Sequence, residues 1–516
     1  MNNFLIKLNH FIWPIILSVV FIFIFQVNIK YLLLLPLLLI SIFMFLKSEK
    51  LLYLYVFSLP FIGLGILNTL LNVNLGTGFQ LSYLFTGLLV CVLIIDVLLS
   101  KNKILIVKSK VNIFIILLFF IAVLSLLMSF FIPVTEFLDE KPFVKTFKQL
   151  MQLFIMVCMY FVIVIFLNSK DRFKNCINIL FISGFLVSCY GLYQFVGYYF
   201  KLPYTNIFSS NVGILTAHDS KLFLGSSFVD ILRIRSTTPE PAMFSNYLIC
   251  IIPLQIIFLI KRIYKNPKIR ILHLFFLVVN TLAFILTFSK GGYLAILGSL
   301  SIIIWYLRNQ IILKRLFFKT VVGIVFMLFV FGIFNSTLLG IPINSSFAFV
   351  WARINQITNV EDISNITRLN SYKAAGKMAL YFPVLGVGLG NYGFYYNDFR
   401  PSNARIEKEV WPISNNIYLR VLSELGIIGF CIFCLIVYYL YKESKYIIKL
   451  TRNYPYWNSA SIGLLASGVG ILIQYLAIET LSFSHVWFIM AAIVSLKGII
   501  MKSYKTKSRG AVENSN

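Results

Sequence analysis

Acidic residues are scarce in this chain. Only 18 of its 516 residues are Asp or Glu, and charged residues of both signs make up 12% of the sequence. A soluble globular chain carries about a quarter charged residues, so this composition excludes an ordinary soluble protein. The hydrophobic fraction of 59% leaves a surplus of apolar side chains that only a lipid bilayer can accommodate.

Cysteine and histidine are also too few or too badly placed to predict a disulfide framework or a metal site. The seven cysteines all lie in or beside apolar segments. Cys431 and Cys434 have CxxC spacing, but they sit in an apolar helix without a second ligand pair. We therefore interpret the cysteines as small buried hydrophobes and expect neither a metal nor a cofactor.

Long apolar segments dominate the chain, and about 20 such residues cross a bilayer as a helix. The first run, 11–27, lacks a small-residue cleavage site and is expected to span rather than be cleaved. The sequence predicts an all-α polytopic membrane protein with a bundle of about 12–14 transmembrane helices. The candidate spans are 11–28, 31–47, 51–68, 79–99, 112–133, 151–167, 175–199, 243–260, 271–288, 290–307, 319–340, 418–441, 458–478 and 484–500.

Basic residues follow the alternation of these spans. They gather at 47–50, 101–110, 170–174, 261–270, 308–319, 442–452 and 502–509, whereas the short connection 69–78 has none. Cytoplasmic loops carry this excess of Lys and Arg, so we expect both termini to be cytoplasmic. Topology thus accounts for most of the net charge of +27, and nucleic acid is not an expected partner.

Two long connections, 200–242 and 341–417, then lie outside the cytoplasm. They divide the chain into N-terminal spans (1–199), central spans (243–340) and C-terminal spans with a basic tail (418–516). Long loops without a span are usually functional, and we expect short interfacial helices in both. The polar segment 134–150 is predicted to be an interfacial helix that leads into the sixth span.

The first long loop ends with two arginines, Arg233 and Arg235, followed by Glu240 and the span 243–260. The planar fork of Arg binds phosphate oxygens two at a time, so an anionic lipid head group is the expected partner. Simple interfacial anchoring remains an alternative. Lys290, between the spans 271–288 and 290–307, also lies outside against the charge trend. It either snorkels or faces a polar cavity that holds an anion.

The second long loop begins with a basic helical pattern. Arg368, Tyr372, Lys373 and Lys377 recur at helical spacing, with Ala374, Met378 and Phe382 near the opposite face. We expect a helix that lies flat over the bundle with its cations near head groups.

A glycine-rich stretch follows, and residues 388–393 have the form GxGxxG. No strand–helix–strand context surrounds them, so we reject a dinucleotide site and expect tight turns near the membrane.

Polar residues also open the span 418–441. Asn415 and Asn416 precede it, and Arg420 and Glu424 stand four residues apart on one helix face. An ionisable pair inside the membrane is a functional candidate, and a structural ion pair is the alternative. Gly426 and Gly429 allow close helix approach.

In this order, the motifs resemble the O-antigen ligase and polymerase family of bacterial surface polysaccharide assembly. The elements are R-x-x-S/G-T-x-x-x-P, T-x-S-[R/K], R-x-x-x-[WY], P-x-x-G-x-G-x-G and [HN]-N-x-[YL]-L-x-x-L-x-E-x-G-x-x-G, and they cover roughly residues 225–430. The resemblance implies a metal-independent glycosyltransferase that takes undecaprenyl-pyrophosphate-linked glycans outside the cytoplasmic membrane. It implies that Arg233 or Arg235 and Lys290 bind the pyrophosphate, and that Arg368 holds the loop or the glycan.

Two departures from the family pattern shape the hypothesis. Lys290 stands where the family commonly has Arg, and Asn415 stands where ligases often have the His that activates the acceptor. Asn cannot take a proton, which leaves Glu240 and Glu424 as the available carboxylates and favours a polymerase over a ligase. We predict a catalytic group of Arg233, Arg235, Lys290, Glu240 and Glu424, and a substrate-binding group of Arg368, Lys373, Lys377, Asn415, Asn416 and Arg420.

The leading hypothesis is thus a polymerase that joins lipid-linked repeat units by an inverting route. Expected partners are the lipid-linked oligosaccharides, membrane lipid, a chain-length regulator and a flippase. A ligase that moves a finished glycan to another acceptor is the closest alternative. A flippase or transporter belongs to another class and would place charges around a mid-bilayer cavity. A scaffold without chemistry predicts harmless substitutions at the cations.

Overall fold

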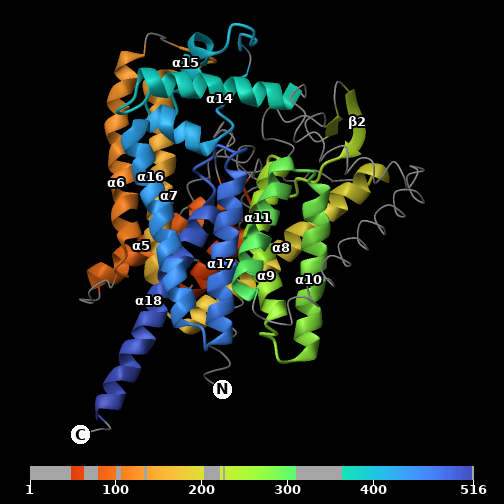
Figure 1. Cartoon of the computed structure of the whole chain (residues 1–516), viewed down its shortest axis with the longest axis vertical. Helices are drawn as coiled ribbons and strands as arrows, with labels where there is room; N and C mark the ends of the chain where they lie inside the picture. Colours follow the sequence, from red (N-terminus) through yellow and green to blue (C-terminus); the bar gives the residue numbers. More distant parts are fainter. Residues whose placement is uncertain are drawn as a thin grey trace, which may run out of the picture.

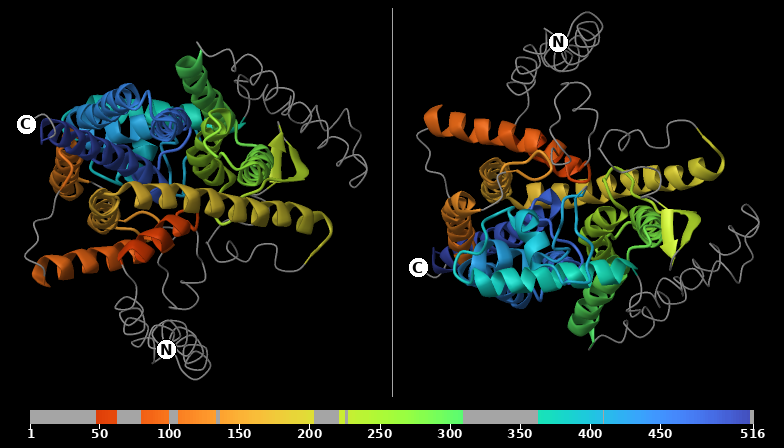
Figure 2. Two further views of the ribbon diagram at one scale, coloured as in Figure 1. Left: turned by 90° about the horizontal axis from the view of Figure 1, so that it is seen from below. Right: turned by 90° about the horizontal axis from the view of Figure 1, so that it is seen from above.

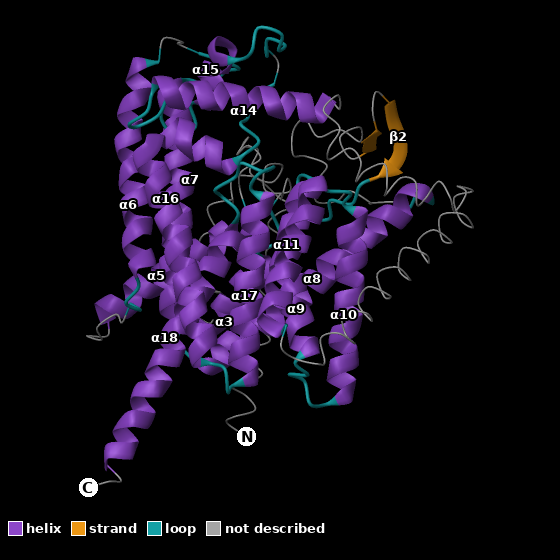
Figure 3. Ribbon diagram, in the orientation of Figure 1, coloured by secondary structure: helices purple, strands orange, loops and turns teal. Residues whose placement is uncertain are grey.

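The structure is a computed structural model that describes residues 48–62, 80–99, 106–132, 136–202, 221–224, 227–308, 363–408 and 410–513. The predicted spans 11–28, 31–47 and 319–340 lie outside these ranges. Of the span 51–68, the structure describes the part within and just after α3 (Ser48–Ser58). Helices make up most of the described chain (Figure 3).

Ten described helices are long and apolar enough to cross a membrane, which confirms an all-α polytopic membrane protein. The closely spaced spans 271–288 with 290–307, and 458–478 with 484–500, are each two separate helices. The ten are α5 (Leu81–Leu99), α6 (Lys110–Leu124, continued by the 3-10 helix η3, Ser125–Phe131), α7 (Pro142–Phe166), α8 (Lys170–Tyr199), α9 (Pro241–Ile260), α10 (Pro267–Leu286), α11 (Lys290–Leu307), α16 (Ile417–Leu450), α17 (Pro455–Gln474) and α18 (Ser484–Glu513).

Helix α9 lies at the centre of the bundle. Residues 244–255 are all buried, as expected for a helix that is hydrophobic on every side. Asn246 of α9 donates from Nδ2 to Gln474 Oε1 of α17 at 2.9 Å and shares a 2.7 Å hydrogen bond with His485 Nε2 of α18. Hydrogen bonds between helices satisfy polar groups that lipid would leave unpaired, so this network fixes α9, α17 and α18 together.

The two ends of the bundle differ in character. One end carries α14 (Ile363–Tyr381) and α15 (Tyr392–Phe399), and we call it the α14 end (Figure 1). At the opposite end, Lys174 lies 5.8 Å from the ring centre of Trp457, and Lys261 donates to Asn458. The described basic clusters of 170–174, 261–270 and 442–452 all belong to helix ends on this side. That the opposite end faces the cytoplasm stays a prediction.

Helix α14 lies across the end of the bundle, over α16 and toward α11 (Figures 1 and 2). The second long loop therefore contains the interfacial helices that the sequence predicts. In the first long loop, the described part is instead a two-stranded antiparallel hairpin, β1 (Lys221–Leu224) and β2 (Ser227–Leu232). The expectation of a helix there is wrong for these residues, because the short runs pair with each other.

The expectation for the segment 134–150 also needs correction. Residues 142–150 are the first turns of α7 itself, with Pro142 at the start, and not a separate interfacial helix. Proline suits the first turn because it has no N–H to satisfy there. The preceding residues 137–140 form a tight turn in which Phe137 and Glu140 exchange backbone hydrogen bonds.

Candidate active site

The segment that carries Arg233 and Arg235 enters the bundle beside α8. Arg235 is 5% exposed, and Ser236, Thr237 and Thr238 are at most 3% exposed. Such burial requires internal partners for the backbone and the hydroxyls. The prediction of a surface loop with two equivalent arginines is therefore too simple, since Arg235 is buried and Arg233 is half-buried.

Gln194 of α8 supplies the main partners of this segment. Its Oε1 accepts from the Ser236 backbone N–H at 2.8 Å, and its Nε2 donates to the Ser236 carbonyl at 3.1 Å. Ser236 also donates from Oγ to the Val187 carbonyl at 2.6 Å, and Thr237 donates to the Pro60 carbonyl at 2.7 Å. The hydroxyl-rich motif thus anchors the arginine segment to α8 and to the chain after α3.

Arg233 meets the Lys290 motif at the turn between α10 and α11. Its Nε donates to the Thr287 carbonyl at 3.1 Å, and the neighbouring Ile234 N–H donates to the Leu286 carbonyl at 3.0 Å. Ser289 caps α11 by accepting from the Gly292 N–H at 3.2 Å, which is the usual role of serine before a helix. Two motifs separated by some 50 residues therefore lie side by side, with Lys290 at the first position of α11.

Helix α14 and the loop 475–483 between α17 and α18 extend the site. Lys290 Nζ lies 3.5 Å from Asn365 Oδ1 at the start of α14. Further along α14, Arg368 Nη1 donates to the Ala477 carbonyl at 3.3 Å, and the Tyr372 hydroxyl donates to the Leu476 carbonyl at 2.7 Å. We call this connection the α17–α18 loop; α14 holds it against the bundle.

These contacts correct the expected basic face of α14. Arg368 and Tyr372 turn toward the α17–α18 loop, whereas Lys373 and Lys377 are exposed. Ala374 and Met378 are fully buried beneath the helix, as the pattern predicts. The four residues therefore do not share one face, because the loop gives the first two partners on the bundle side.

The glycine-rich stretch after α14 packs backbone to backbone against α16. Helix α16 is interrupted at Gly426, whose φ of 65° and ψ of −169° are not helical. The carbonyls of Ser423 and Glu424 accept from Val387 and Gly388 N–H at 2.8 and 3.0 Å. An added Cβ on Gly386, at φ 67°, would lie 2.5 Å from the Ser423 carbonyl oxygen. The glycines thus allow a close backbone approach, in which the carbonyls freed by the break in α16 accept hydrogen bonds inside the membrane.

All three nitrogens of the Arg420 guanidinium have partners within the bundle. Nε pairs with Glu424 Oε2 at 3.0 Å, Nη1 donates to the Glu479 carbonyl at 3.1 Å, and Nη2 donates to Gln149 Oε1 of α7 at 3.1 Å. The Glu424 side chain is 4% exposed. This geometry links α16, α7 and the α17–α18 loop. The Glu424 carboxylate is engaged in the ion pair with Arg420.

A third carboxylate, Glu479, lies beside the two asparagines. Its Oε2 accepts from the Ser414 N–H, from Ser414 Oγ at 2.6 Å and from the Asn415 N–H at 3.1 Å. In the ranges that the structure describes, Oε1 accepts no hydrogen bond. Burial raises the pKa of the Glu479 carboxyl, against the lowering effects of Arg420 and of the Ser414 hydrogen bonds.

Asn415 and Asn416 differ in their surroundings. Asn416 caps α16 by accepting from the Tyr418 and Leu419 N–H groups at 2.9 and 3.2 Å, and its Nδ2 donates to the Leu476 carbonyl at 3.4 Å. Asn415 is half-buried and has a positive φ of 56°, which Asn tolerates better than most residues. The amide of Asn416 is thus fully used in the fold, while its role in substrate binding stays a prediction.

The motifs and the geometry agree with a comparison to known families. Residues 275–434 match the family model described as O-antigen ligase. This part of the chain is therefore similar to the O-antigen ligase family. The matched segment runs from α10 through α14, α15 and the first half of α16, and so includes Lys290, Arg368 and Asn415. The chain matches no curated protein.

The ten described helices that are long and apolar enough to cross a membrane make this chain a multi-pass membrane protein. Arg233, Glu240 and Glu479 lie outside the matched segment, yet Arg233 and Glu479 contact it through Thr287 and Asn415. Glu240 is exposed before α9, and its backbone carbonyl accepts from Thr238 Oγ1 at 2.9 Å.

Sequence reasoning missed three residues of the site: Gln149, Gln194 and Glu479. Gln194 lies inside the predicted span 175–199, and Gln149 lies in the first turns of α7, just before the predicted span 151–167. Neither side chain carries a charge. Glu479 follows an apolar run in a short connection, and only the fold brings it next to Asn415. The sequence signal for Glu479 was that an acidic residue stands in a short connection of a chain that has few acidic residues.

Proposed function

We propose that the protein is a polymerase of lipid-linked oligosaccharide repeat units, acting at the outer face of the cytoplasmic membrane on undecaprenyl-pyrophosphate-linked glycans. The proposal is supported by one arrangement at the α14 end. Arg233 and Lys290 meet at the α10–α11 turn, and α14 links that turn to the α17–α18 loop, which holds Glu479 against Asn415. The cations that would bind the phosphate and the carboxylate that would take a proton from the acceptor hydroxyl are thus linked by one set of contacts.

The cations serve the leaving group. An acceptor hydroxyl oxygen attacks the anomeric carbon of the donor, and the bond from that carbon to the pyrophosphate oxygen breaks with its electron pair. The pyrophosphate gains negative charge as it leaves, and fixed positive groups in a poorly hydrated site stabilise that charge. We assign this role to Arg233 and Lys290. Arg235, which is buried, and Arg368, on α14, support the segment and the loop.

Glu479 serves the acceptor. The attacking hydroxyl must lose its proton, and Asn415 has no group that can take it. The Glu479 carboxylate is held in place by three hydrogen bonds to Oε2, which leaves Oε1 as the atom that accepts the proton. Glu424 is assigned to positioning Arg420, because its carboxylate is buried in that ion pair.

Deleting the gene tests the reaction class. A polymerase defect leaves single repeat units on the lipid carrier and on the cell surface. Long chains that accumulate on the carrier without attachment would instead indicate a ligase, which the family description of residues 275–434 keeps as the second candidate. Units trapped on the cytoplasmic side would indicate a flippase. A chain-length regulator and a flippase are the proposed protein partners.

Cysteine labelling tests the orientation. Single cysteines introduced at Lys377 and at Lys268 lie at the α14 end and at the opposite end, and both side chains are exposed. A membrane-impermeant maleimide added to whole cells should label the first and spare the second, in a background without the native cysteines. The reverse pattern would place the site in the cytosol, where the proposed donor glycan is not presented.

A further inference from the structure

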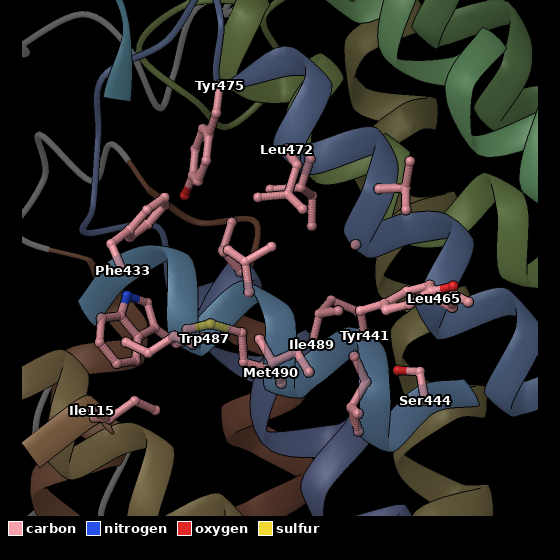
Figure 4. A pocket seen from close by; sticks show the side chains of 18 of the residues that line it. Ile115, Phe433, Tyr441, Ser444, Leu465, Leu472, Tyr475, Trp487, Ile489 and Met490 are labelled. Carbon is pink, nitrogen blue, oxygen red and sulfur yellow. The ribbon is translucent and has the colours of Figure 1, made fainter. Parts of the chain in front are cut away.

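A second feature of the bundle is an apolar cavity between α6, α16, α17 and α18 (Figure 4). Its volume is about 270 Å³. The walls are side chains such as Ile115, Phe433, Leu472 and Met490, and none of the described residues that line it is charged. Protein interiors rarely leave voids larger than a water molecule, and an apolar cavity of about 150 Å³ is enough to bind benzene. This space is large enough for several methyl-branched carbons of a hydrocarbon chain.

The apolar cavity adjoins the α17–α18 loop of the candidate site. Leu481 of the α17–α18 loop lines both the apolar cavity and a small polar cavity of about 20 Å³ that also includes Gln149, Arg420 and Ser482. The Leu481 carbonyl accepts from Trp487 Nε1 at 2.6 Å, which fixes the loop at this point. Tyr475 lies at the same end, with its hydroxyl directed into the cavity (Figure 4). An apolar chamber and a cationic group thus meet at one loop.

We propose that this cavity holds part of the isoprenoid chain of the lipid-linked substrate, with the pyrophosphate end of that chain toward the α17–α18 loop. The occupant is named from the proposed function and rests on it. A chain with regular methyl branches gains from filling an irregular apolar space, and it needs no charged partner along its length. A single-chain occupant with an anionic end matches a cavity that is lined mostly by apolar side chains and adjoins the polar residues beyond Leu481.

Gly468 offers a direct way to fill the cavity. It lies in α17 and lines the cavity, and a Cβ built on it meets no atom within 4 Å. Gly468→Phe therefore places a ring in the open space, whereas Gly468→Ala adds one methyl group. Gly87 of α5 is exposed and likewise has nothing within 4 Å of an added Cβ. Gly87→Phe is thus the matched control for the same chemical change outside the cavity.

The measurement is binding of two probes to purified protein in detergent. For undecaprenyl pyrophosphate, Gly468→Phe should raise Kd about tenfold or more, because the ring displaces buried methylene groups. Gly468→Ala and Gly87→Phe should bind like the wild type. Isopentenyl pyrophosphate, which has the anionic end but only five carbons, should bind all four proteins alike. A thermal unfolding curve of each variant identifies loss of fold.

Three outcomes would overturn the assignment. Equal Kd values of Gly468→Phe and Gly87→Phe for undecaprenyl pyrophosphate would remove the cavity from the binding path. A parallel loss of isopentenyl pyrophosphate binding would point to a disturbed anion site. Displacement of the carrier by an equal concentration of dioleoyl phosphatidylglycerol would assign the cavity to bulk lipid. If the wild type extends no glycan but Gly468→Phe still weakens carrier binding, the proposed function fails and the cavity assignment stands.

Discussion

The backbone N–H of Asn415 donates to Oε2 of Glu479 across 3.1 Å. This hydrogen bond joins the start of α16 to the α17–α18 loop, at the position where related ligases often place a histidine. The sequence motif thus lacks a proton acceptor, and the fold places beside it a carboxylate from a residue 64 positions away.

Replacing Glu479 tests this role directly. Glu479→Gln keeps an oxygen that accepts from Ser414 and Asn415 but removes the basic carboxylate. We expect glycan transfer to fall about 10²–10⁴-fold, the usual contribution of a general base, with the protein still folded. The measurement is the rate of extension of a lipid-linked repeat unit in proteoliposomes.

Glu479→Asp is the matched control, because it keeps the charge and shortens the side chain by one methylene. It should retain more activity than Glu479→Gln. Equal losses in the two variants, together with a lower unfolding temperature, would show that Glu479 acts only as a structural cap of the 414–415 backbone.

The pH dependence of transfer follows from the same carboxylate. Burial raises the pKa of Glu479, and a general base works only when deprotonated. The rate should therefore fall as the pH drops through this raised pKa, and the midpoint should lie above the ordinary glutamate value of about 4.3. In Glu479→Gln the residual rate should lose this acid limb, and a limb that persists would assign the titration to another group.

Lys290 is expected to stabilise the leaving pyrophosphate. Lys290→Ala should lower the rate by about 10²–10³-fold, the loss seen when one preorganised charge-stabilising group is removed. Lys290→Arg should retain activity, because it restores the residue common in the family. Lys268→Ala at the opposite end of the bundle is the control, since Lys268 is exposed there. A normal rate in Lys290→Ala would remove this residue from the anion site.

Hydropathy predicted the spanning helices well because lipid imposes one requirement on every residue of a span. It even separated α10 from α11, which only three residues divide. It was wrong for 142–150, where charged residues on the first turns of α7 looked like an interfacial helix. The first turns of a long spanning helix can carry the same charged residues as an interfacial helix.

The site was only partly predictable for a different reason. Lys290 was visible because it is a cation against the charge trend. Arg233 was visible as one of two arginines in a long loop, and Arg368 as part of a helical pattern of basic residues. The burial of Arg235, the split face of α14 and the approach of Glu479 to Asn415 depend on contacts between distant segments. Such contacts have no local pattern. Equally, no periodicity shows that Gly386 meets the backbone of Ser423.

A double-mutant cycle tests whether the Arg420–Glu424 pair is a structural ion pair or takes part in the reaction. Both groups are nearly buried, with side chains 12% and 4% exposed. Arg420→Met leaves the Glu424 carboxylate without its partner, which should destabilise the protein by about 3–5 kcal/mol. Arg420→Met combined with Glu424→Leu should recover much of that loss, measured by thermal unfolding in detergent.

The activity of the double variant decides what the pair does. Recovery of stability without recovery of glycan transfer would give the pair a part in the reaction or in substrate binding. Recovery of both would leave it a structural ion pair that positions the α17–α18 loop.

Gly426 is required by the break in α16. It has a φ of 65°, and a Cβ there would meet the carbonyl of Val384. Gly426→Ala should therefore destabilise the fold by more than the roughly 1–2 kcal/mol that a left-handed conformation costs a residue with a side chain. The unfolding temperature should fall, and transfer should fall with it because the loop 383–390 loses its seat on α16.

Gly376 of α14 is the control for this substitution. An added Cβ at Gly376 meets no atom within 4 Å, and alanine is favoured over glycine inside a helix by roughly 0.5–1 kcal/mol. Gly376→Ala should therefore leave the unfolding temperature unchanged or raise it. If Gly426→Ala behaved like Gly376→Ala, α16 would be continuous in solution, and the backbone seat for the glycine-rich stretch would not exist.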